Sequence, residues 1–314
     1  MASYWDLYGP GDTRGMRIVV APGQGSQKPG FLAAWLEDPA VANQLGHWSE
    51  AIGIDLVAHG TTSDAETIRD TKIAQPLIVA AGLIAGRALQ SRLSDAPVAY
   101  AGHSVGEFTA AALSGVFSDD QAMALVATRG RAMAEAAAGT PTGMAAVVGA
   151  DLETLRAPLE AAGVVPANVN SSTQVVAAGP LDALEALRES PPEGTRVIPL
   201  EVAGAFHTDY MAPARNTLAE AAAGVAPHDP RAALYTNKDG SVVSSGQTYL
   251  DLLVSQMTSP VRWDLCMQAF ESAGVSELIE LAPAGALVGL AKRALPGIVT
   301  RKLDLPEHLD EIDY

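Results

Sequence analysis

Cysteine is almost absent from this sequence: Cys266 is the only one among 314 residues. A single thiol cannot form an internal disulfide, which excludes a small secreted protein held together by a disulfide framework. Its apolar neighbours, Trp263 and Met267 among them, indicate a packed thiol rather than a nucleophile. Basic residues are scarce too, because 20 Lys and Arg stand against 36 Asp and Glu and give a formal net charge of −16. This excess of negative charge argues against nucleic acid and anionic membranes as partners.

Long hydrophobic runs are missing as well. No apolar stretch approaches the about 18 residues of a membrane span, and the N-terminus lacks a basic segment followed by an apolar one. We therefore expect a cytoplasmic protein without a membrane partner. Hydrophobic residues still make up 48% of the chain, enough for a large core in one large domain or two joined ones. We expect a monomer with no metal site and no permanently bound cofactor.

The first fifteen residues differ from the rest of the chain. They are polar, Gly-rich and aromatic, and they end before Met16, which opens a strand-like run over 16–21. We therefore expect residues 1–15 to be an N-terminal extension outside the fold.

Strand and helix signals alternate along the chain. A strand over 18–21 leads into the Gly-rich turn 22–27, a helix covers 73–89, and a strand over 97–101 precedes further helices that end near Ala138. This order is typical of an α/β protein with a buried parallel sheet. The pattern breaks at 139–143 and resumes after 203, with element signals over 209–223, 233–237, 249–256, 263–273 and 275–280.

The segment between these two parts has its own order, βαββαβ, which is typical of a ferredoxin-like module. We therefore predict a large domain formed by 16–138 and 204–314, and an inserted small domain over 139–203, with a cleft between them. The expected strands of the insertion are 144–148, 164–170, 174–178 and 196–201, and the expected helices are 152–162 and 181–189.

Residues 102–107 read Gly-His-Ser-Val-Gly-Glu, between a strand signal and a helix signal. Gly-x-Ser-x-Gly in that setting is typical of a nucleophile elbow, in which a sharp turn exposes the serine hydroxyl. Ser104 is therefore the candidate nucleophile. The alternative is an ordinary βα turn whose serine caps the helix starting near Val105.

A nucleophilic serine needs a base, and His207 is the best of six histidines. It lies in the small apolar turn 202–208, which joins the inserted module to the next helix and should border the cleft. The alternative is a packed histidine bonded to backbone. No Asp or Glu stands out as the third member of a triad, so a carbonyl could orient His207 instead.

Arg129 is a charge in an apolar place. It shares the apolar stripe of the helix over 119–138 with Leu125, Val126 and Met133. An unpaired buried guanidinium costs several kcal/mol, and its planar fork suits a carboxylate. The partner is either an internal acidic side chain, solvent reached by snorkelling, or a substrate carboxylate, and the elbow serine favours the substrate.

Gln24 lies in the first βα turn, and such turns meet the elbow at the carboxyl edge of a parallel sheet. The N–H groups of Gln24 and Val105 could therefore form an oxyanion hole. The turn does not match a phosphate-binding loop, because it lacks Gly-x-x-x-x-Gly-Lys-Ser/Thr and Gly-x-Gly-x-x-Gly.

Several motifs in register resemble those of malonyl-CoA:acyl carrier protein transacylases, and the chain is most similar to the stand-alone actinobacterial enzymes. The resemblance covers Met16 to about Leu295. The motifs are 22–27 (PGQGSQ), 102–107 (GHSVGE), Arg129-Gly130 with Met133, 167–170 (ANVN) with Gln174, 204–207 (GAFH), Gln256 before 260–263 (PVRW), and 289–293 (GLAKR).

The resemblance implies an α/β-hydrolase-like large domain with a ferredoxin-like insertion. It implies a Ser104–His207 dyad whose histidine is held by the Gln256 carbonyl, with oxyanion donors at Gln24 and Val105. By the same matching Arg129 binds the malonyl carboxylate. The other implied site residues are Met133, Asn168 and Phe206 at the substrate, and Lys292 and Arg293 as a basic rim for coenzyme A or carrier phosphates, unless the last two are merely exposed helix charges.

Two positions depart from the family pattern. Position 105 is Val where many relatives have Leu or Gln, and position 204 is Gly where many malonyl-selective polyketide acyltransferases have His. Phe206 is retained, and its bulk beside the base should crowd an α-methyl group, which favours malonyl over methylmalonyl.

The implied reaction is ping-pong transfer of malonyl from malonyl-CoA, through malonyl-Ser104, to the phosphopantetheine thiol of an acyl carrier protein in fatty-acid or polyketide synthesis. One alternative is a serine hydrolase or thioesterase, although such enzymes usually run Ser, then Asp or Glu, then His. Others are a trans-acting polyketide acyltransferase for a different acyl group and a non-catalytic carrier-binding protein.

Overall fold

The structure is a computed structural model that describes residues 16–93 and 98–312. The expected extension over 1–15 therefore lies outside the described residues. Four parallel strands form the main sheet in the order β2-β1-β8-β9. Their bounds are β1 Met16–Ala21, β2 Val98–Gly102, β8 Val275–Leu281 and β9 Val299–Leu303.

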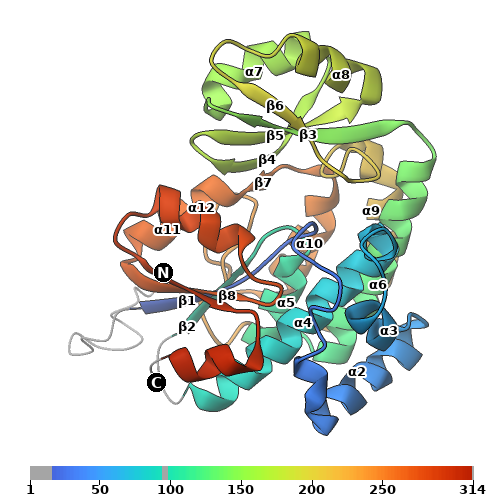
Figure 1. Cartoon of the computed structure of the whole chain (residues 1–314), viewed down its shortest axis with the longest axis vertical. Coiled ribbons are helices and arrows are strands. Elements are labelled where there is room, and N and C mark those ends of the chain that lie inside the picture. Colours follow the sequence, from blue (N-terminus) through green and yellow to red (C-terminus); the bar gives the residue numbers. More distant parts are fainter. Residues whose placement is uncertain (1–15, 94–97, 313–314) are drawn as a thin grey trace.

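Helices cover both faces of this sheet (Figure 1). Successive residues of β1 face opposite sides, so Val19 and Ala21 pack into one core with α4, α5 and α6, whereas Ile18 and Val20 pack into a second core with α11 and α12. Burial on both faces explains why the strand reads as a continuous apolar run. The helices of the large domain are α2 Pro39–Ile52, α3 Leu56–Thr61, α4 Thr71–Arg92, α5 Gly106–Ser114, α6 Asp119–Ala138, α9 Ala212–Ala222, α10 Gly246–Ser255, α11 Trp263–Ser272 and α12 Ala286–Ala294.

Helix α4 corrects one expectation. Among the described helices it is long and apolar enough to cross a membrane, contrary to the prediction that no such segment exists. However, 83% of its apolar window is buried inside the protein, where α4 packs lengthwise against α6. Burial in this core accounts for its composition.

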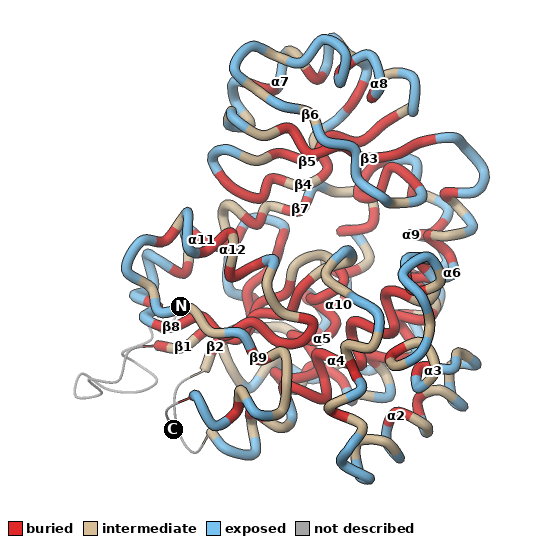
Figure 2. The backbone as a smooth tube through the Cα atoms, in the orientation of Figure 1, coloured by how far each residue is buried: buried red, intermediate tan, exposed pale blue. Residues whose placement is uncertain are grey.

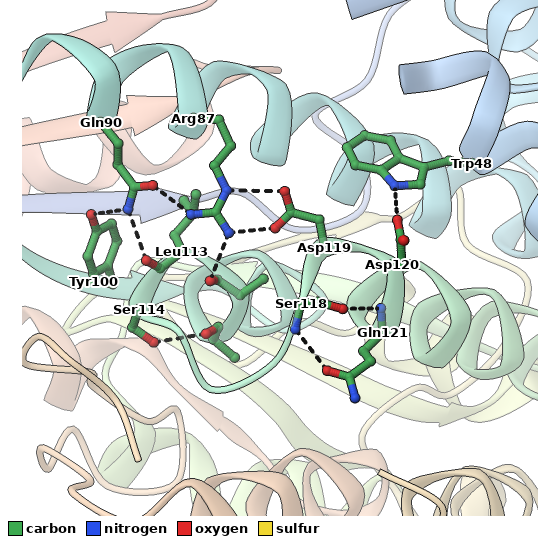
Figure 3. Close-up of polar contacts among 12 residues, drawn as sticks. Trp48, Arg87, Gln90, Tyr100, Leu113, Ser114, Ser118, Asp119, Asp120 and Gln121 are labelled. Carbon is green, nitrogen blue, oxygen red and sulfur yellow. Dashed lines mark hydrogen bonds and ion pairs between the residues drawn. The ribbon is translucent and has the colours of Figure 1, made fainter. Parts of the chain in front are cut away.

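The N-terminal end of α6 is held by polar contacts (Figure 3). Arg87 of α4 forms two hydrogen bonds to the Asp119 carboxylate, at 2.6 and 3.1 Å. Trp48 of α2 donates to Asp120, and Ser118 caps the helix with Gln121 in a capping box. These contacts fix the axis of the helix that carries Arg129.

The inserted unit has the predicted βαββαβ order. Its sheet order β6-β3-β5-β4 is antiparallel throughout, as in a ferredoxin-like module. Helices α7 and α8 cover the outer face, and the other face looks toward the large domain (Figures 1 and 2). The elements are β3 Thr142–Val148, α7 Leu152–Ala161, β4 Val165–Ser171, β5 Gln174–Pro180, α8 Leu181–Glu189 and β6 Arg196–Pro199.

The structure differs from the sequence prediction in several elements. The element signal over 233–237 does not become a regular helix or strand, because these residues form only isolated bridges, one between Leu234 and Tyr100. An unpredicted strand, β7 Val261–Arg262, pairs in parallel with β4 and adds a fifth strand to the small sheet. The predicted helix 209–223 begins as a 3-10 turn over Asp209–Met211 before α9. The α/β class, with a parallel main sheet and an inserted ferredoxin-like unit, is confirmed.

Candidate active site

Ser104 lies on a sharp turn between β2 and α5. Its backbone has a positive φ of 53°, which is unusual for a non-glycine residue. The flanking glycines make the turn possible: a Cβ on Gly102 would lie 2.0 Å from the Gly106 carbonyl carbon, and one on Gly106 would lie 2.2 Å from the Ala21 oxygen. The motif therefore has the geometry of a nucleophile elbow packed against the end of β1.

Asn237 holds this turn from the side, a contact that the sequence reasoning missed. Its Oδ1 accepts the Ser104 N–H at 2.7 Å, and its Nδ2 donates to the Gly102 carbonyl at 2.7 Å. The available signal was its position at the end of 233–237, because this segment runs beside β2 and reaches the same sheet edge.

His207 faces the serine. Its Nε2 lies 2.8 Å from Ser104 Oγ, and its Nδ1 lies 2.9 Å from the Gln256 carbonyl oxygen. A carbonyl only accepts, so Nδ1 carries the proton and Nε2 is free to accept from the serine hydroxyl. Burial lowers the pKa of His207 to about 3, helped by the nearby Arg129 charge. The imidazole is therefore neutral at physiological pH and able to take a proton.

Arg129 is 1% exposed and points into the same site from α6. Its Nη1 donates to Gln75 Oε1 at 2.7 Å, and its Nη2 donates to Gln256 Oε1 at 3.1 Å and to Ser104 Oγ at 3.3 Å. Within the part of the chain that the structure describes, no carboxylate lies within ion-pair distance of the guanidinium, and Nε has no hydrogen-bond partner. Burial lowers the pKa of Arg129 to about 10, so the cation persists at neutral pH.

Glu107 is a second buried ionisable group, which the sequence reasoning passed over. It is 1% exposed on the first turn of α5, and burial raises its pKa to about 8. Its carboxyl accepts from the Asn237 N–H at 2.6 Å and from Gln256 Nε2 at 2.5 Å. An acidic residue inside the otherwise apolar segment after the elbow was the signal. Gln256 thus contacts His207, Arg129 and Glu107 with three different atoms.

The first βα turn lies against the elbow. His103 donates its N–H to the Ala21 oxygen, and a Cβ on Gly23 would lie 2.9 Å from the His103 ring. Among the described residues, the N–H groups of Gln24 and Val105 have no hydrogen-bond acceptor, as unoccupied oxyanion donors would. The Gln24 side chain bonds to Thr71 of α4.

The other predicted substrate residues are Met133, Phe206 and Asn168. Met133 is buried with its Sδ 3.2 Å from Gln75 Nε2, and Phe206 is 5% exposed beside the base. The Asn168 Oδ1 is buried and has no partner in the described chain. A Cβ on Gly204 would lie 2.7 Å from the Ala137 Cβ, so a larger residue there requires α6 to move.

Lys292 and Arg293 do not join the buried group. Both are exposed on the last turn of α12, which packs against the main sheet and contacts β4 of the small domain (Figure 1). They can reach a ligand only at the surface. Over residues 16–93 and 98–312, no cluster of three potential metal ligands occurs.

A parallel sheet with an elbow serine facing a histidine places this protein among the α/β proteins built around an activated serine. The family profile described as "Acyl transferase domain" matches residues 18–299. The malonyl CoA-acyl carrier protein transacylase of Mycobacterium tuberculosis is 50% identical over 299 residues, which cover 95% of this chain and 99% of that protein. The chain belongs to this acyltransferase family.

Solved structures agree. The crystal structure of MCAT from Mycobacterium tuberculosis superposes with a TM-score of 0.92 at 50% identity, covering 94% of this chain and 99% of that one. A type II PKS acyl-carrier protein in complex with its malonyl-transacylase gives 0.86 at 31% identity, covering 94% and 98%. These likenesses confirm the predicted fold and family.

Proposed function

We propose that this acyltransferase moves the malonyl group of malonyl-CoA to the phosphopantetheine thiol of an acyl carrier protein, in the cytoplasm, through a malonyl-Ser104 intermediate. The observation that carries the proposal is the contact of a buried, carboxylate-free Arg129 with the nucleophilic hydroxyl. An acyl group with a terminal carboxylate supplies the anion that this cation lacks. The mycobacterial relative bears the corresponding name.

In the first half-reaction His207 Nε2 takes the Ser104 proton as Oγ bonds to the thioester carbonyl carbon. The N–H groups of Gln24 and Val105 would stabilise the oxyanion. The C–S bond then breaks, and the leaving coenzyme A thiolate takes the proton back from His207. In the second half the carrier thiol gives its proton to His207 and attacks the ester carbon, and Ser104 leaves with that proton.

We assign the surroundings of the acyl group accordingly. Met133 and Asn168 line it, and Phe206 beside the base disfavours an α-methyl, which selects malonyl over methylmalonyl. Residues 139–203 act as a small domain over the large domain of 16–138 and 204–314, and the β4–β7 pairing joins the two. The enzyme would act in fatty-acid or polyketide synthesis, depending on which carrier protein it serves. One structurally similar protein was solved in complex with a type II PKS carrier.

Intact mass spectrometry tests the central step. Mixed with malonyl-CoA alone, the wild type should gain one malonyl group per chain, and Ser104→Ala should gain none. Adding an acyl carrier protein that bears phosphopantetheine should then discharge the enzyme and load the carrier. Carrier loading without any acyl-enzyme would rule out the two-step mechanism, and discharge at the same rate without carrier would indicate a hydrolase.

A further inference from the structure

The proposed steps leave the buried carboxyl of Glu107 without a task. It sits one turn from the nucleophile, in a place where desolvation raises its pKa to about 8. Burying such a group is costly unless it is fully hydrogen-bonded. Its partners therefore indicate what the carboxyl does there.

Both carboxyl oxygens of Glu107 accept hydrogen bonds. Oε1 accepts from the backbone N–H of Asn237 at 2.6 Å, and a backbone N–H cannot become an acceptor. Oε2 accepts from Gln256 at 2.5 Å. The hydroxyls of Thr236 and Tyr249 also face the carboxyl, so a protonated form can donate to one of them and keep both contacts.

Three acceptors surround Gln256 Nε2 and set which way its carboxamide faces: Glu107 Oε2 is the nearest at 2.5 Å, ahead of the Ser104 carbonyl oxygen at 3.3 Å and Asn237 Oδ1 at 3.4 Å. Because Glu107 presents an acceptor, the NH₂ group of Gln256 must turn toward it, and Oε1 must then face Arg129. That oxygen accepts from Arg129 Nη2 at 3.1 Å, while Gln75 holds Nη1 at 2.7 Å. If the amide were reversed, the NH₂ group of Gln256 would face the N–H groups of Arg129, and neither could accept a hydrogen bond from the other.

This relay holds the arginine without neutralising it. The two groups that orient the guanidinium are neutral amide oxygens, and the nearest buried carboxyl reaches it only through Gln256. A carboxylate in direct contact would occupy the fork that a substrate anion needs. Because Gln256 lies between them, Glu107 orients the Arg129 guanidinium without occupying the donors that a substrate carboxylate would use.

We propose that Glu107 is a positioning residue for acyl-group selection, which sets the Gln256 carboxamide and through it the Arg129 fork that receives a carboxylate-bearing acyl group. The inference rests on the proposed function. It concerns preference between acyl groups, so it is separable from the chemistry of the Ser104–His207 pair.

The test compares single-turnover acylation of Ser104 by malonyl-CoA and acetyl-CoA. Glu107→Gln keeps the shape, but its one oxygen must face the fixed Asn237 N–H, so its NH₂ faces Gln256, which should reverse and release Arg129. The malonyl-to-acetyl rate ratio should fall about ten- to hundredfold, the size expected for one lost hydrogen bond to a charged group. Glu280→Gln is the matched control, because it makes the same change in another fully buried carboxyl, and it should leave the ratio unchanged.

A double variant sharpens the test. E107Q with Q256E re-forms the hydrogen bond between positions 107 and 256 with donor and acceptor exchanged, but it puts a carboxylate directly on Arg129. Acetyl acylation should recover relative to E107Q, whereas malonyl acylation should stay low. If E107Q does not fold, Q256A serves in its place, since it removes the relay and keeps the backbone carbonyl on His207, and its ratio should fall too.

An E107Q or Q256A ratio within twofold of wild type would overturn the proposal and leave Glu107 a purely structural residue. Equal losses for both thioesters would overturn it as well. Arg129→Ala identifies failure of the underlying function: if that variant also keeps the wild-type ratio, Arg129 does not bind the acyl carboxylate at all.

Discussion

Two residues of the site, Ser104 and His207, are the described non-glycine residues with positive φ, at 53° and 62°. Such backbone conformations cost of the order of 1–3 kcal/mol each and persist only where neighbours enforce them. Asn237 enforces the first by binding the Ser104 N–H and the Gly102 carbonyl, and the Gln256 carbonyl holds the ring of the second. The strain aligns Oγ with Nε2 before any substrate binds.

At the same scale, Arg129 should select the acyl group. Removing one member of a buried charge pair typically costs about 3–5 kcal/mol, and each ~1.4 kcal/mol is about tenfold in rate. Arg129→Ala should therefore slow malonyl acylation by roughly two to four decades, while acetyl acylation should hold or rise. Acylation of Ser104 by both thioesters, followed by mass spectrometry, measures this. An equal fall for both donors would make Arg129 structural.

The pH profile should reflect the depressed pKa of His207. A group with a lowered pKa stays neutral, and so remains a base, down to about pH 3. The rate constant kcat/KM for malonyl-pantetheine, which carries no titrating phosphate, should be flat between pH 7 and 5. An ordinary histidine with a pKa near 6.5 would lose about 25-fold over that range. In Arg129→Ala, assayed with acetyl-pantetheine, loss of the nearby charge should move the acidic limb upward. A wild-type limb near pH 6.5 would contradict the burial argument.

At this scale the sequence pointed to Ser104, His207 and Arg129, which the structure brings into contact. Each of these residues stands in a recognisable local pattern of the sequence: an elbow motif for the serine, a small apolar turn for the histidine and an apolar helical stripe for the arginine. A backbone carbonyl has no such pattern, so the partner of His207 came only from the family resemblance. Glu107 and Asn237 were missed because their contact joins residues 130 positions apart.

At the scale of elements, Glu280 anchors α12. This fully buried residue at the end of β8 accepts the N–H groups of Gly285, Leu287 and Val288 at 2.8–2.9 Å, which satisfies the free end of the helix. The carboxylate thereby ties the helix that carries Lys292 to the main sheet.

Glu280→Ala should therefore destabilise the protein. It leaves three N–H groups without an acceptor, two of them buried, a loss of about 1–3 kcal/mol or more. We expect the melting temperature to fall by several degrees, at about 2–4 °C per kcal/mol for a chain of this size. Amide hydrogen exchange should become faster over 285–295. Glu280→Gln keeps one acceptor oxygen, so its melting temperature and exchange rates should lie between those of the wild type and Glu280→Ala. Unchanged exchange in this helix would show that packing alone fixes it.

Two of the segments in which the structure differs from the prediction, β7 and 233–237, share a physical cause, which is that each has a parallel pairing partner far away in the sequence. Strand β7 has two residues, and its pairing with β4 crosses from one unit to the other, so no local periodicity marks it. The segment 233–237 has strand-like residues but finds only single bridges at the sheet edge. By contrast, the insertion's helix α8 was predicted with its observed bounds, because its amphipathic pattern and flanking turns are local.

At the scale of the whole molecule, charge poses a problem for carrier binding. The protein carries a formal net charge of −16, so an acidic carrier must approach through a locally positive surface. The described residues offer two candidate surfaces. Lys292 and Arg293 are exposed on α12, close to the small-domain strand β4. Arg69, Lys72 and Arg131 line a hollow between α4, α6 and the chain after β6, but two acidic partners, Asp70 and Glu201, already pair with the first two.

We therefore expect the carrier to dock beside α12. Replacing Lys292 and Arg293 with Ala should slow transfer from pre-formed malonyl-enzyme to an acidic carrier by roughly three- to tenfold at low salt, and should weaken its salt dependence. Loss of malonyl to water should stay near wild type, because the buried dyad is untouched. Arg215→Ala with Arg231→Ala is the matched control, since it removes two exposed charges elsewhere and should leave the salt slope intact. Carrier kinetics unchanged by the α12 pair but slowed by Arg131→Ala would move the docking surface to the α4–α6 side.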